Sequence, residues 1–244
     1  MKLAIQQPCF LPWIPYFDLI NKVDTFIFLD SVVCPQKQSF INRNRFFFRK
    51  KFQWIKLNLK KDERKLFLNE KKITSLSINN KNDYLHIFEE YFKDGEKFEK
   101  IFKLFKNLTE NCYKKTLSEY NIASIRQICE ILNLKTKLIK SSDILDNEVV
   151  REKKFKGPDL VKYFCEKYGC QELYNFSSGI EKNIEPFCDV SFFKENNISL
   201  YRQEIESYVN GNDEVLLSSI IQVLLNFSKD EILSKMNINY KKIY

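Results

Sequence analysis

The first 30 residues combine a strand, a proline-rich loop, a helix and a second strand, and this order limits the fold more than any other feature. Residues 2–6 form a short apolar run, and three prolines exclude regular structure from the loop that follows it. Apolar residues over 14–23 have helical spacing, and the continuous apolar run at 26–29 is typical of a buried strand. These elements predict a βαβ unit with two parallel strands and a right-handed crossover.

Strand and helix patterns alternate through the rest of the chain. Apolar or alternating runs predict strands at residues 46–48, 53–59, 73–78, 136–139, 173–174 and 198–201. Apolar residues three and four apart predict helices at residues 83–108, interrupted at Asp94 and Gly95, and at 116–133, 158–168 and 214–226. This alternation is typical of an α/β fold with a mostly parallel, Rossmann-like sheet and flanking helices. We expect one domain over residues 1–244, with a helical insertion at about 80–135.

Composition and charge narrow the class of protein. A chain of 244 residues with 44% hydrophobic and 15% aromatic content is a folded one, because disordered chains are poor in aromatic residues. Its net charge of +8 fits a nucleic acid, an anionic membrane surface or a phosphorylated small molecule as partner, although solubility alone also accounts for it. The cations are mixed with acids along the chain, with one denser run from Arg43 to Lys51.

Cysteine usage and hydropathy indicate the compartment. The seven cysteines are scattered and odd in number, and with one histidine they form no recognisable metal-ligand pattern. The apolar run after Met1 is shorter than that of a secretory leader, and no run of about 18 apolar residues is present to cross a membrane. We therefore expect a cytoplasmic protein with reduced, buried thiols and no membrane span.

The loop between the first strand and the first helix is the first candidate site. Ligands of open α/β sheets bind beyond the carboxyl ends of the strands, which is where residues Gln6–Trp13 lie in the predicted unit. The helix N-terminus behind the loop offers free N–H groups and a positive dipole end to an anion. The rings of Phe10 and Trp13 can stack on a base or a sugar face, or else pack within a rigid proline loop.

The segment after the second strand is the second candidate site. Asp30 follows the carboxyl end of that strand and is predicted to point into the same crevice. Asparagine and arginine alternate over Asn42–Arg45, so an extended chain places the asparagines on one face and the arginines on the other. Arginine forks bind phosphate or carboxylate through two hydrogen bonds. With Lys37 nearby, we interpret this segment as an anion site, and a basic surface strand with a structural asparagine pair is the alternative.

The two segments together contain Gln7-Pro8, Leu11-Pro12-Trp13, Tyr16-Phe17, Asp30, Lys37 and Asn42-Arg43-Asn44-Arg45. This combination resembles the N-terminal pattern of the WbqC-like family, whose members are encoded in bacterial surface-polysaccharide clusters. Fainter similarity continues in Ser141-Ser142-Asp143, Tyr174–Gly179 and Ser218-Ser219-Ile220-Ile221. The resemblance implies enzymes that modify sugars, for example by placing an amino acid such as glycine on an amino sugar. The βαβ unit is also similar in architecture to nucleotidylyltransferases, without the two histidines of their loop.

The chain departs from the family pattern at three positions. Members of the family often carry His where Gln6 stands, Gly where Pro15 stands and Asp where Gln222 stands. Neither glutamine ionises, so acid–base roles at these positions are absent here. Two further hypotheses are Cys9 as a nucleophile beside a helix N-terminus and Ser177–Gly179 as a phosphate-contacting turn.

The resemblance, taken with the two candidate sites, implies an enzyme of bacterial surface-glycan biosynthesis that transfers an acyl or aminoacyl group to an amino sugar carried on a nucleotide. Asp30 and Lys37 are the predicted catalytic residues. The predicted substrate-binding residues are Gln7, Pro8, Trp13, Tyr16, Asn42, Arg43, Asn44, Arg45, Ser178 and Gly179. No metal or cofactor is predicted, and a need for ATP stays open. A nucleic-acid-binding module and a non-catalytic scaffold that docks onto glycan-biosynthesis enzymes are the alternatives.

Overall fold

The computed structural model describes residues 1–35, 39–61, 65–110, 112–176 and 190–243. The strands are β1 (Lys2–Gln6), β2 (Thr25–Phe28), β3 (Arg43–Phe48), β4 (Lys51–Leu59), β5 (Ile73–Ile78), β6 (Lys137–Lys140), β7 (Glu172–Phe176), β8 (Ser199–Gln203) and β9 (Tyr240–Lys242). The α-helices are α1 (Ile14–Lys22), α2 (Tyr84–Phe92), α3 (Phe98–Thr109), α4 (Leu117–Leu132), α5 (Asn147–Glu152), α6 (Gly157–Lys167), α9 (Val190–Glu195), α10 (Ile205–Asn210), α11 (Ile220–Asn226) and α12 (Lys229–Lys235). Short 3₁₀ turns are present at Cys112–Lys114 and Ser141–Asp143.

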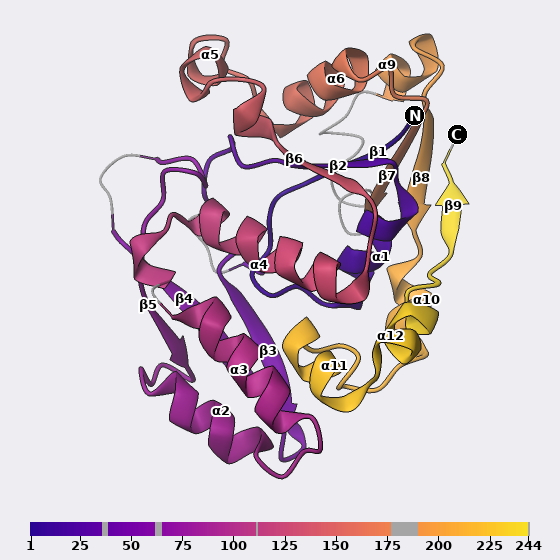
Figure 1. The fold of residues 1–244 in the computed structure, drawn as a ribbon. Helices are drawn as coiled ribbons and strands as arrows, with labels where there is room; N and C mark the ends of the chain where they lie inside the picture. The colour runs from indigo at the N-terminus through magenta and orange to yellow at the C-terminus, as the bar shows by residue number, and fades with distance from the viewer. Residues whose placement is uncertain (36–38, 62–64, 111, 177–189, 244) are drawn as a thin grey trace.

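Within the described residues, the large sheet has six strands in the order β6-β2-β1-β7-β8-β9. Its first five strands are parallel, and β9 joins the edge in the antiparallel direction. The predicted βαβ unit is present, because β1 pairs with β2 in parallel and α1 connects them. The α/β class with a mostly parallel sheet and flanking helices is therefore confirmed (Figure 1).

The small sheet, β3-β4-β5, is an antiparallel meander that lies beside the large sheet, below it in the view of Figure 1. One of its faces is covered by the helix pair α2 and α3. Phe46 of β3 contacts this pair through Phe88 and Phe105, with ring centroids 5.5 and 6.3 Å away. Helices α2, α3 and α4 all lie in the stretch for which a helical insertion was predicted, and α2 ends just before the predicted break at Asp94 and Gly95.

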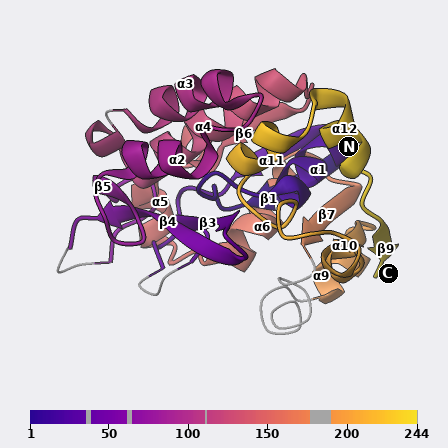
Figure 2. The same ribbon diagram turned by 90° about the horizontal axis from the view of Figure 1, so that it is seen from below.

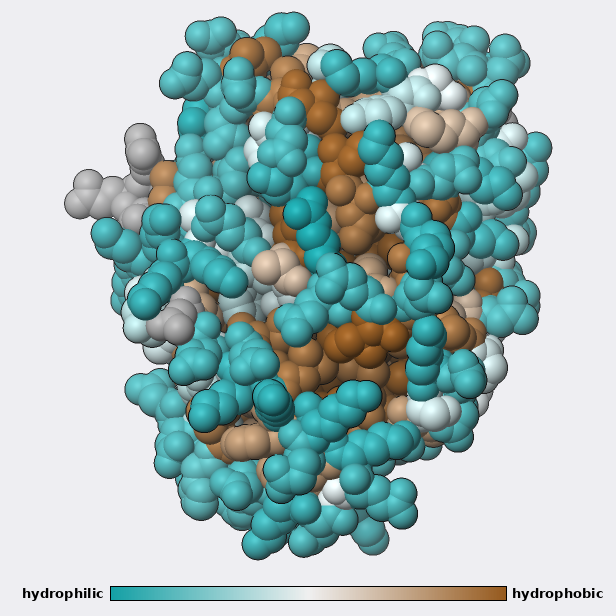
Figure 3. Space-filling model, in the orientation of Figure 1, coloured by the Kyte–Doolittle hydropathy of each residue, from teal (hydrophilic) through white to brown (hydrophobic). Residues whose placement is uncertain are grey.

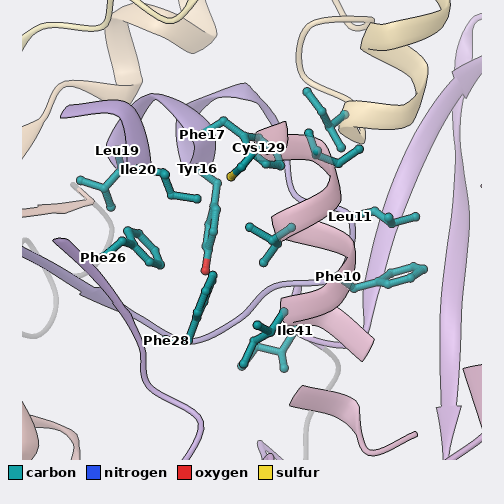
Figure 4. Packing of buried hydrophobic residues seen from close by; sticks show 14 of the residues in the cluster. Phe10, Leu11, Tyr16, Phe17, Leu19, Ile20, Phe26, Phe28, Ile41 and Cys129 are labelled. Atoms are coloured by element: carbon teal, nitrogen blue, oxygen red, sulfur yellow. The ribbon is translucent and has the colours of Figure 1, made fainter. Parts of the chain in front are cut away.

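The core of the large sheet is aromatic. Tyr16 points from α1 into this core beside Phe26 and Phe28 (Figure 4). Cys129 of α4 is buried in the same cluster. The ring of Tyr16 lies 5.5 Å from that of Phe26, and its hydroxyl donates to the carbonyl of Gln7 at 2.9 Å. Outside this core, the face drawn in Figure 3 is mostly hydrophilic, with hydrophobic side chains visible in furrows between polar ones. Across the described segments, none of the helices combines the length and apolar character needed to cross a bilayer.

The helix predicted for residues 214–226 was wrong in its first half, because α11 begins only at Ile220. Asp213 accepts hydrogen bonds from the N–H groups of Val215 and Leu216, and these bonds close a turn before the helix. Ser219 has a non-helical backbone (φ −54°, ψ 144°) and donates its N–H to the carbonyl of Arg45 in β3 at 2.9 Å. The apolar periodicity could not reveal this because a distant strand competes for the backbone.

Asn121, on the buried side of α4, joins the two segments predicted to form a site. Its Nδ2 donates to the carbonyl of Pro8 and to that of Ile41, both at 2.8 Å, and its side chain has no exposed surface. A loop of prolines cannot satisfy its own carbonyls through regular structure, so a side-chain donor from another element takes that role.

Replacement of Asn121 by alanine tests this tie. Asn121→Ala leaves two carbonyls without a donor in the interior, and we expect the free energy of unfolding to fall by about 2–4 kcal/mol. Urea titration followed by circular dichroism measures the change. The matched control is Glu130→Ala on the exposed side of the same helix, which should stay within about 0.5 kcal/mol of the parent. Equal stability of the two variants would contradict the assignment.

Candidate functional site

The topology of the large sheet defines where a ligand is expected. From β1 the chain proceeds outward to β2 and β6, then returns to place β7 on the other side of β1 and continues to β8. The strand order therefore reverses between β1 and β7. In open α/β sheets the crevice beyond the carboxyl ends of the strands at such a switch point is the usual binding place.

A pocket of about 510 Å³ lies at this position. Its described lining residues are Cys9, Pro12, Trp13, Tyr16, Phe40, Asn44, Arg45, Phe176, Ile205, Val209 and Leu217. Phe176 is the last residue of β7, which fixes the pocket at the switch point. Both segments that were predicted to share one crevice contribute residues to the walls of this pocket. The volume and the mainly aromatic and aliphatic lining are those of small-molecule sites.

One wall of the pocket is the proline-rich loop, which is held through the carbonyl of Leu11. Leu11 has a φ of 40°, a left-handed conformation uncommon for a residue with a side chain. Its carbonyl accepts hydrogen bonds from Asn44 Nδ2 at 2.6 Å and from Ser219 Oγ at 3.0 Å. Strand β3 and the start of α11 thus fix the loop in a conformation that its own sequence does not favour.

Asn44 is one of the predicted substrate-binding residues, and this residue is 3% exposed. Besides its bond to Leu11, Nδ2 donates to the carbonyl of Phe10 at 3.1 Å, and Oδ1 accepts the N–H of Arg45 at 2.8 Å. All three bonds are made inside the protein, so this amide builds the pocket wall. A direct bond from Asn44 to a ligand stays a prediction.

Gln222, which departs from the family pattern, has a structural role in this chain. Its Oε1 accepts the N–H of Phe47 at 2.6 Å, and its Nε2 donates to the carbonyl of the same residue at 2.7 Å. The glutamine amide thereby binds the edge of β3 as a neighbouring strand would, and joins it to α11. A carboxylate could accept the first bond but has no donor for the second.

Arg45 brings a positive charge to an otherwise largely apolar pocket. Its guanidinium lies over the ring of Phe52, with Cζ 3.8 Å from the ring centroid. Its Nε is buried and has no hydrogen-bond partner among the described residues. Burial lowers the pKa of Arg45, although an arginine stays protonated near neutral pH. A positioned and incompletely paired guanidinium at a pocket wall is suited to bind an anionic group.

The two aromatic residues predicted to bind substrate, Trp13 and Tyr16, both line the pocket. Trp13 is half-buried and meets Tyr208 of α10 edge-on, with ring centroids 6.0 Å apart. The hydroxyl of Tyr16 is used internally by its bond to Gln7, and burial raises its pKa well above the ordinary value. Tyr16 therefore offers its ring, and not an ionised oxygen, to this space.

Four further predicted residues lie outside this lining. The carbonyls of Gln7 and Pro8 accept hydrogen bonds from Tyr16 and Asn121. Asn42 donates from Nδ2 to the carbonyl of Leu57 at 3.2 Å. The guanidinium of Arg43 lies 4.1 Å from the ring centroid of Trp54, on the open side of the small sheet. Three more predicted positions, Lys37, Ser178 and Gly179, lie outside the described residues.

The structure places Asp30 at the carboxyl ends of β2 and β6, apart from the pocket lining. Asp30 is 1% exposed. It accepts hydrogen bonds from the hydroxyl of Ser141 at 2.7 Å, from the N–H of Ser142 at 2.9 Å and from the hydroxyl of Ser142 at 2.7 Å. These bonds join the ends of two neighbouring strands. The catalytic role predicted for Asp30 stays a prediction, and this geometry adds a structural role.

A substitution separates the two roles of Asp30. In Asp30→Asn one oxygen becomes an amide nitrogen that cannot accept, so we expect the free energy of unfolding to fall by about 1.5–3 kcal/mol. Chemical denaturation measures this change. Ser142→Ala removes one of the three bonds and should cost about 1 kcal/mol. If Asp30→Asn abolishes substrate turnover and leaves stability intact, the structural assignment is wrong.

Cys9 lines the pocket, as a nucleophile would, but its thiol is weakly acidic. Burial raises the pKa of Cys9 to about 12. Its Sγ donates to the carbonyl of Gln7 at 3.7 Å. Since the thiolate is the reactive form, this environment disfavours nucleophilic catalysis. In the part of the chain that the structure describes, no group of three or more His, Cys, Asp or Glu side chains is placed to hold a metal ion.

Thiol alkylation tests the state of Cys9. The pKa shift from 9.0 to about 12 makes the thiolate fraction at pH 7.5 roughly a thousandfold lower than in an ordinary cysteine. We expect iodoacetamide to leave Cys9 unmodified at pH 7.5, and its rate of reaction to rise about tenfold per pH unit as long as the fold persists. Peptide mass spectrometry measures the rate, with free cysteine as control. Rapid alkylation at pH 7.5 contradicts the assignment.

Several wall residues were missed by the sequence analysis. Phe40, Phe176, Ile205, Val209 and Leu217 come from loops, strand ends and the short helix α10. Phe40 is 51% exposed, an exposure that no sequence pattern signals. Asn121 had a usable signal, because it stands on the apolar side of a predicted helix, where a polar residue needs a buried partner.

An open, mostly parallel sheet with a concave, aromatic-lined pocket at its switch point is the arrangement of doubly wound α/β proteins, which bind small ligands there. A comparison with protein-family models identifies the group within this class. The chain belongs to the WbqC-like protein family, whose model matches residues 7–234. Comparisons with curated proteins and with solved structures gave no match.

Proposed function

We propose that this protein is an enzyme of bacterial surface-glycan biosynthesis that transfers an acyl or aminoacyl group to the amine of a nucleotide-linked amino sugar. The observation that carries the proposal is the switch-point pocket, which joins aromatic walls to the guanidinium of Arg45. Membership of the WbqC-like family supports a role associated with glycan biosynthesis. The apolar part and the anionic part of the proposed substrate each have a counterpart in this pocket.

The walls suit a group that is largely apolar. Trp13, Phe40 and Phe176 offer rings, and α10 adds the aliphatic side chains of Ile205 and Val209. Rings of this kind pack against an acyl group or against the C–H face of a sugar. The polar side chains of Asn44 and Tyr16 are already bonded within the protein, so the walls act mainly through shape and burial.

Arg45 suits the anionic part of such a substrate. Its stacking on Phe52 restrains the guanidinium, which lowers the entropy lost when a phosphate or carboxylate binds. In the proposed reaction the amine nitrogen forms a bond to the acyl carbon of an activated donor. The donor's leaving group departs with the electrons of the broken bond, and one proton leaves the nitrogen. Asp30 and Lys37 stay predictions as the groups that handle this proton, and Asp30 lies apart from the pocket lining with its carboxylate bonded to Ser141 and Ser142.

Binding and turnover measurements test the proposal. Isothermal titration of the protein with nucleotide-activated amino sugars should give saturable heat, and mass spectrometry should show an acylated sugar once an activated acyl donor is added. Arg45→Met removes the charge and keeps an apolar stem, so we expect about 10–100-fold weaker binding.

The control for Arg45→Met is Lys103→Met, which removes an equal charge from the exposed side of α3 and should change affinity less than about twofold. Absence of heat with every nucleotide-activated amino sugar, from protein shown to be folded, overturns the proposal. Equal binding by Arg45→Met and the parent removes the role given to Arg45.

A further inference from the structure

The side of the small sheet that α2 and α3 leave uncovered has an unusual composition. Strand alternation and the β3-β4-β5 register place on this open face Arg43, Arg45, Phe47, Phe52, Trp54, Lys56, Asn58, Ser75 and Ser77. Figure 2 shows the helices on one side of β3 and β4 and no labelled helix on the other. The positions of the open face combine cations, aromatic rings and small polar groups, and none of them is Asp or Glu.

The cations on the open face are positioned by aromatic rings. Arg43 lies over Trp54 and Arg45 over Phe52, with Cζ-to-centroid distances of 4.1 and 3.8 Å. Alternate residues of a strand are about 6.5–7 Å apart, so the two guanidinium groups are carried side by side. Lys56 pairs with Arg43 across the strands and adds a third cation. The structure therefore concentrates positive charge on groups whose conformational freedom is already reduced.

Among the described residues, this charge has no counterion at two of the three positions. Neither Arg45 nor Lys56 forms an ion pair with any residue that the structure describes. Like charges this close repel one another, and an anion of two or more charges would relieve the repulsion. A diphosphate fits a pair of adjacent guanidinium groups, because its phosphate oxygens can accept two parallel hydrogen bonds from each arginine.

The open face is continuous with the switch-point pocket. Phe40 lines the pocket, and its ring centroid lies 6.2 Å from that of Trp54. Arg45 also belongs to both, since it lines the pocket and stacks on Phe52. One ligand can therefore have one end in the pocket and the other on the sheet, which favours an extended small molecule over a polymer.

We propose that the open face is a nucleoside-diphosphate subsite, in which Arg43, Arg45 and Lys56 hold the phosphates and the base lies against Phe40 and Trp54. This inference deepens the proposed function, on which it rests, by assigning a place to the nucleotide half of the substrate. Aromatic stacking tolerates any base, and the cations supply the affinity for phosphate.

The two tryptophans of the chain make the location measurable, because Trp13 lies in the pocket and Trp54 on the open face. UDP, ADP, GDP and CDP are titrated into Trp13→Phe and Trp54→Phe while the emission of the remaining tryptophan is followed. We expect at least one of these nucleotides to quench Trp54 saturably and to leave the emission of Trp13 nearly unchanged. Quenching of Trp13 alone overturns the inference, as does no response at all to any of the four nucleotides.

A charge variant with intact tryptophans gives an independent test by calorimetry. Lys56→Met should weaken nucleoside-diphosphate binding about tenfold. Lys51→Met, on the same strand but outside the open face, should change it less than twofold. Equal weakening in both variants overturns the inference. A 20-residue oligothymidylate that binds more tightly than any of the nucleotides, with a steep loss of affinity in salt, overturns it in favour of nucleic acid.

The outcomes separate this inference from the proposed function. Quenching of Trp54 by a nucleotide, with no acylated sugar formed under any condition, supports the subsite and counts against acyl transfer. Saturable binding and acylation of a nucleotide-linked sugar, with unchanged Trp54 emission, supports the enzyme and overturns the subsite.

Discussion

The structure depends on how the carbonyl groups of one proline-rich loop are satisfied. Asn121 of α4 bonds the carbonyl of Pro8, Asn44 of β3 bonds that of Leu11, and the N–H of Ile220 bonds that of Pro12 at 3.0 Å. Each unsatisfied buried carbonyl would cost about 1–3 kcal/mol. Because the donors come from three distant elements, the loop joins α4, the small sheet and α11 to the parallel sheet. The pocket wall is a consequence of this assembly.

The alternating asparagine and arginine residues at the start of β3 have two separate roles, one in holding the fold together and one in carrying charge at the surface. Strand geometry sends Asn44 inward, where its amide is fully used by backbone groups. The same geometry sends Arg43 and Arg45 to the other side, where aromatic rings of β4 support their guanidinium groups. One short motif thus both holds the loop in place and carries positive charge to the pocket and the open face. Neither task is visible from the residue types alone.

The parts of the fold that local sequence predicted are those whose pattern has a single explanation. The βαβ unit over the first 30 residues is one, since apolar runs and prolines leave few alternatives. The helix at 214–226 is the opposite case, because Ser219 gives its N–H to Arg45 of a distant strand and the helix starts late. Asp30 also follows its strand as predicted, yet its carboxylate bonds Ser141 and Ser142 instead of lining the pocket.

The sequence by itself determined the α/β class, the loop beyond the first strand as a candidate site and the facing of residues along β3, because these follow from hydrophobic periodicity and backbone sterics. Only the tertiary structure decided which side chains meet. It placed Phe40, Phe176 and Val209 with Trp13 in the lining of one pocket. It also bonded the amide of Asn44 to the backbone and left the Nε of Arg45 without a described partner. The reason is physical: a pocket is formed by residues far apart in the chain, and their contacts depend on long-range packing that no local pattern encodes.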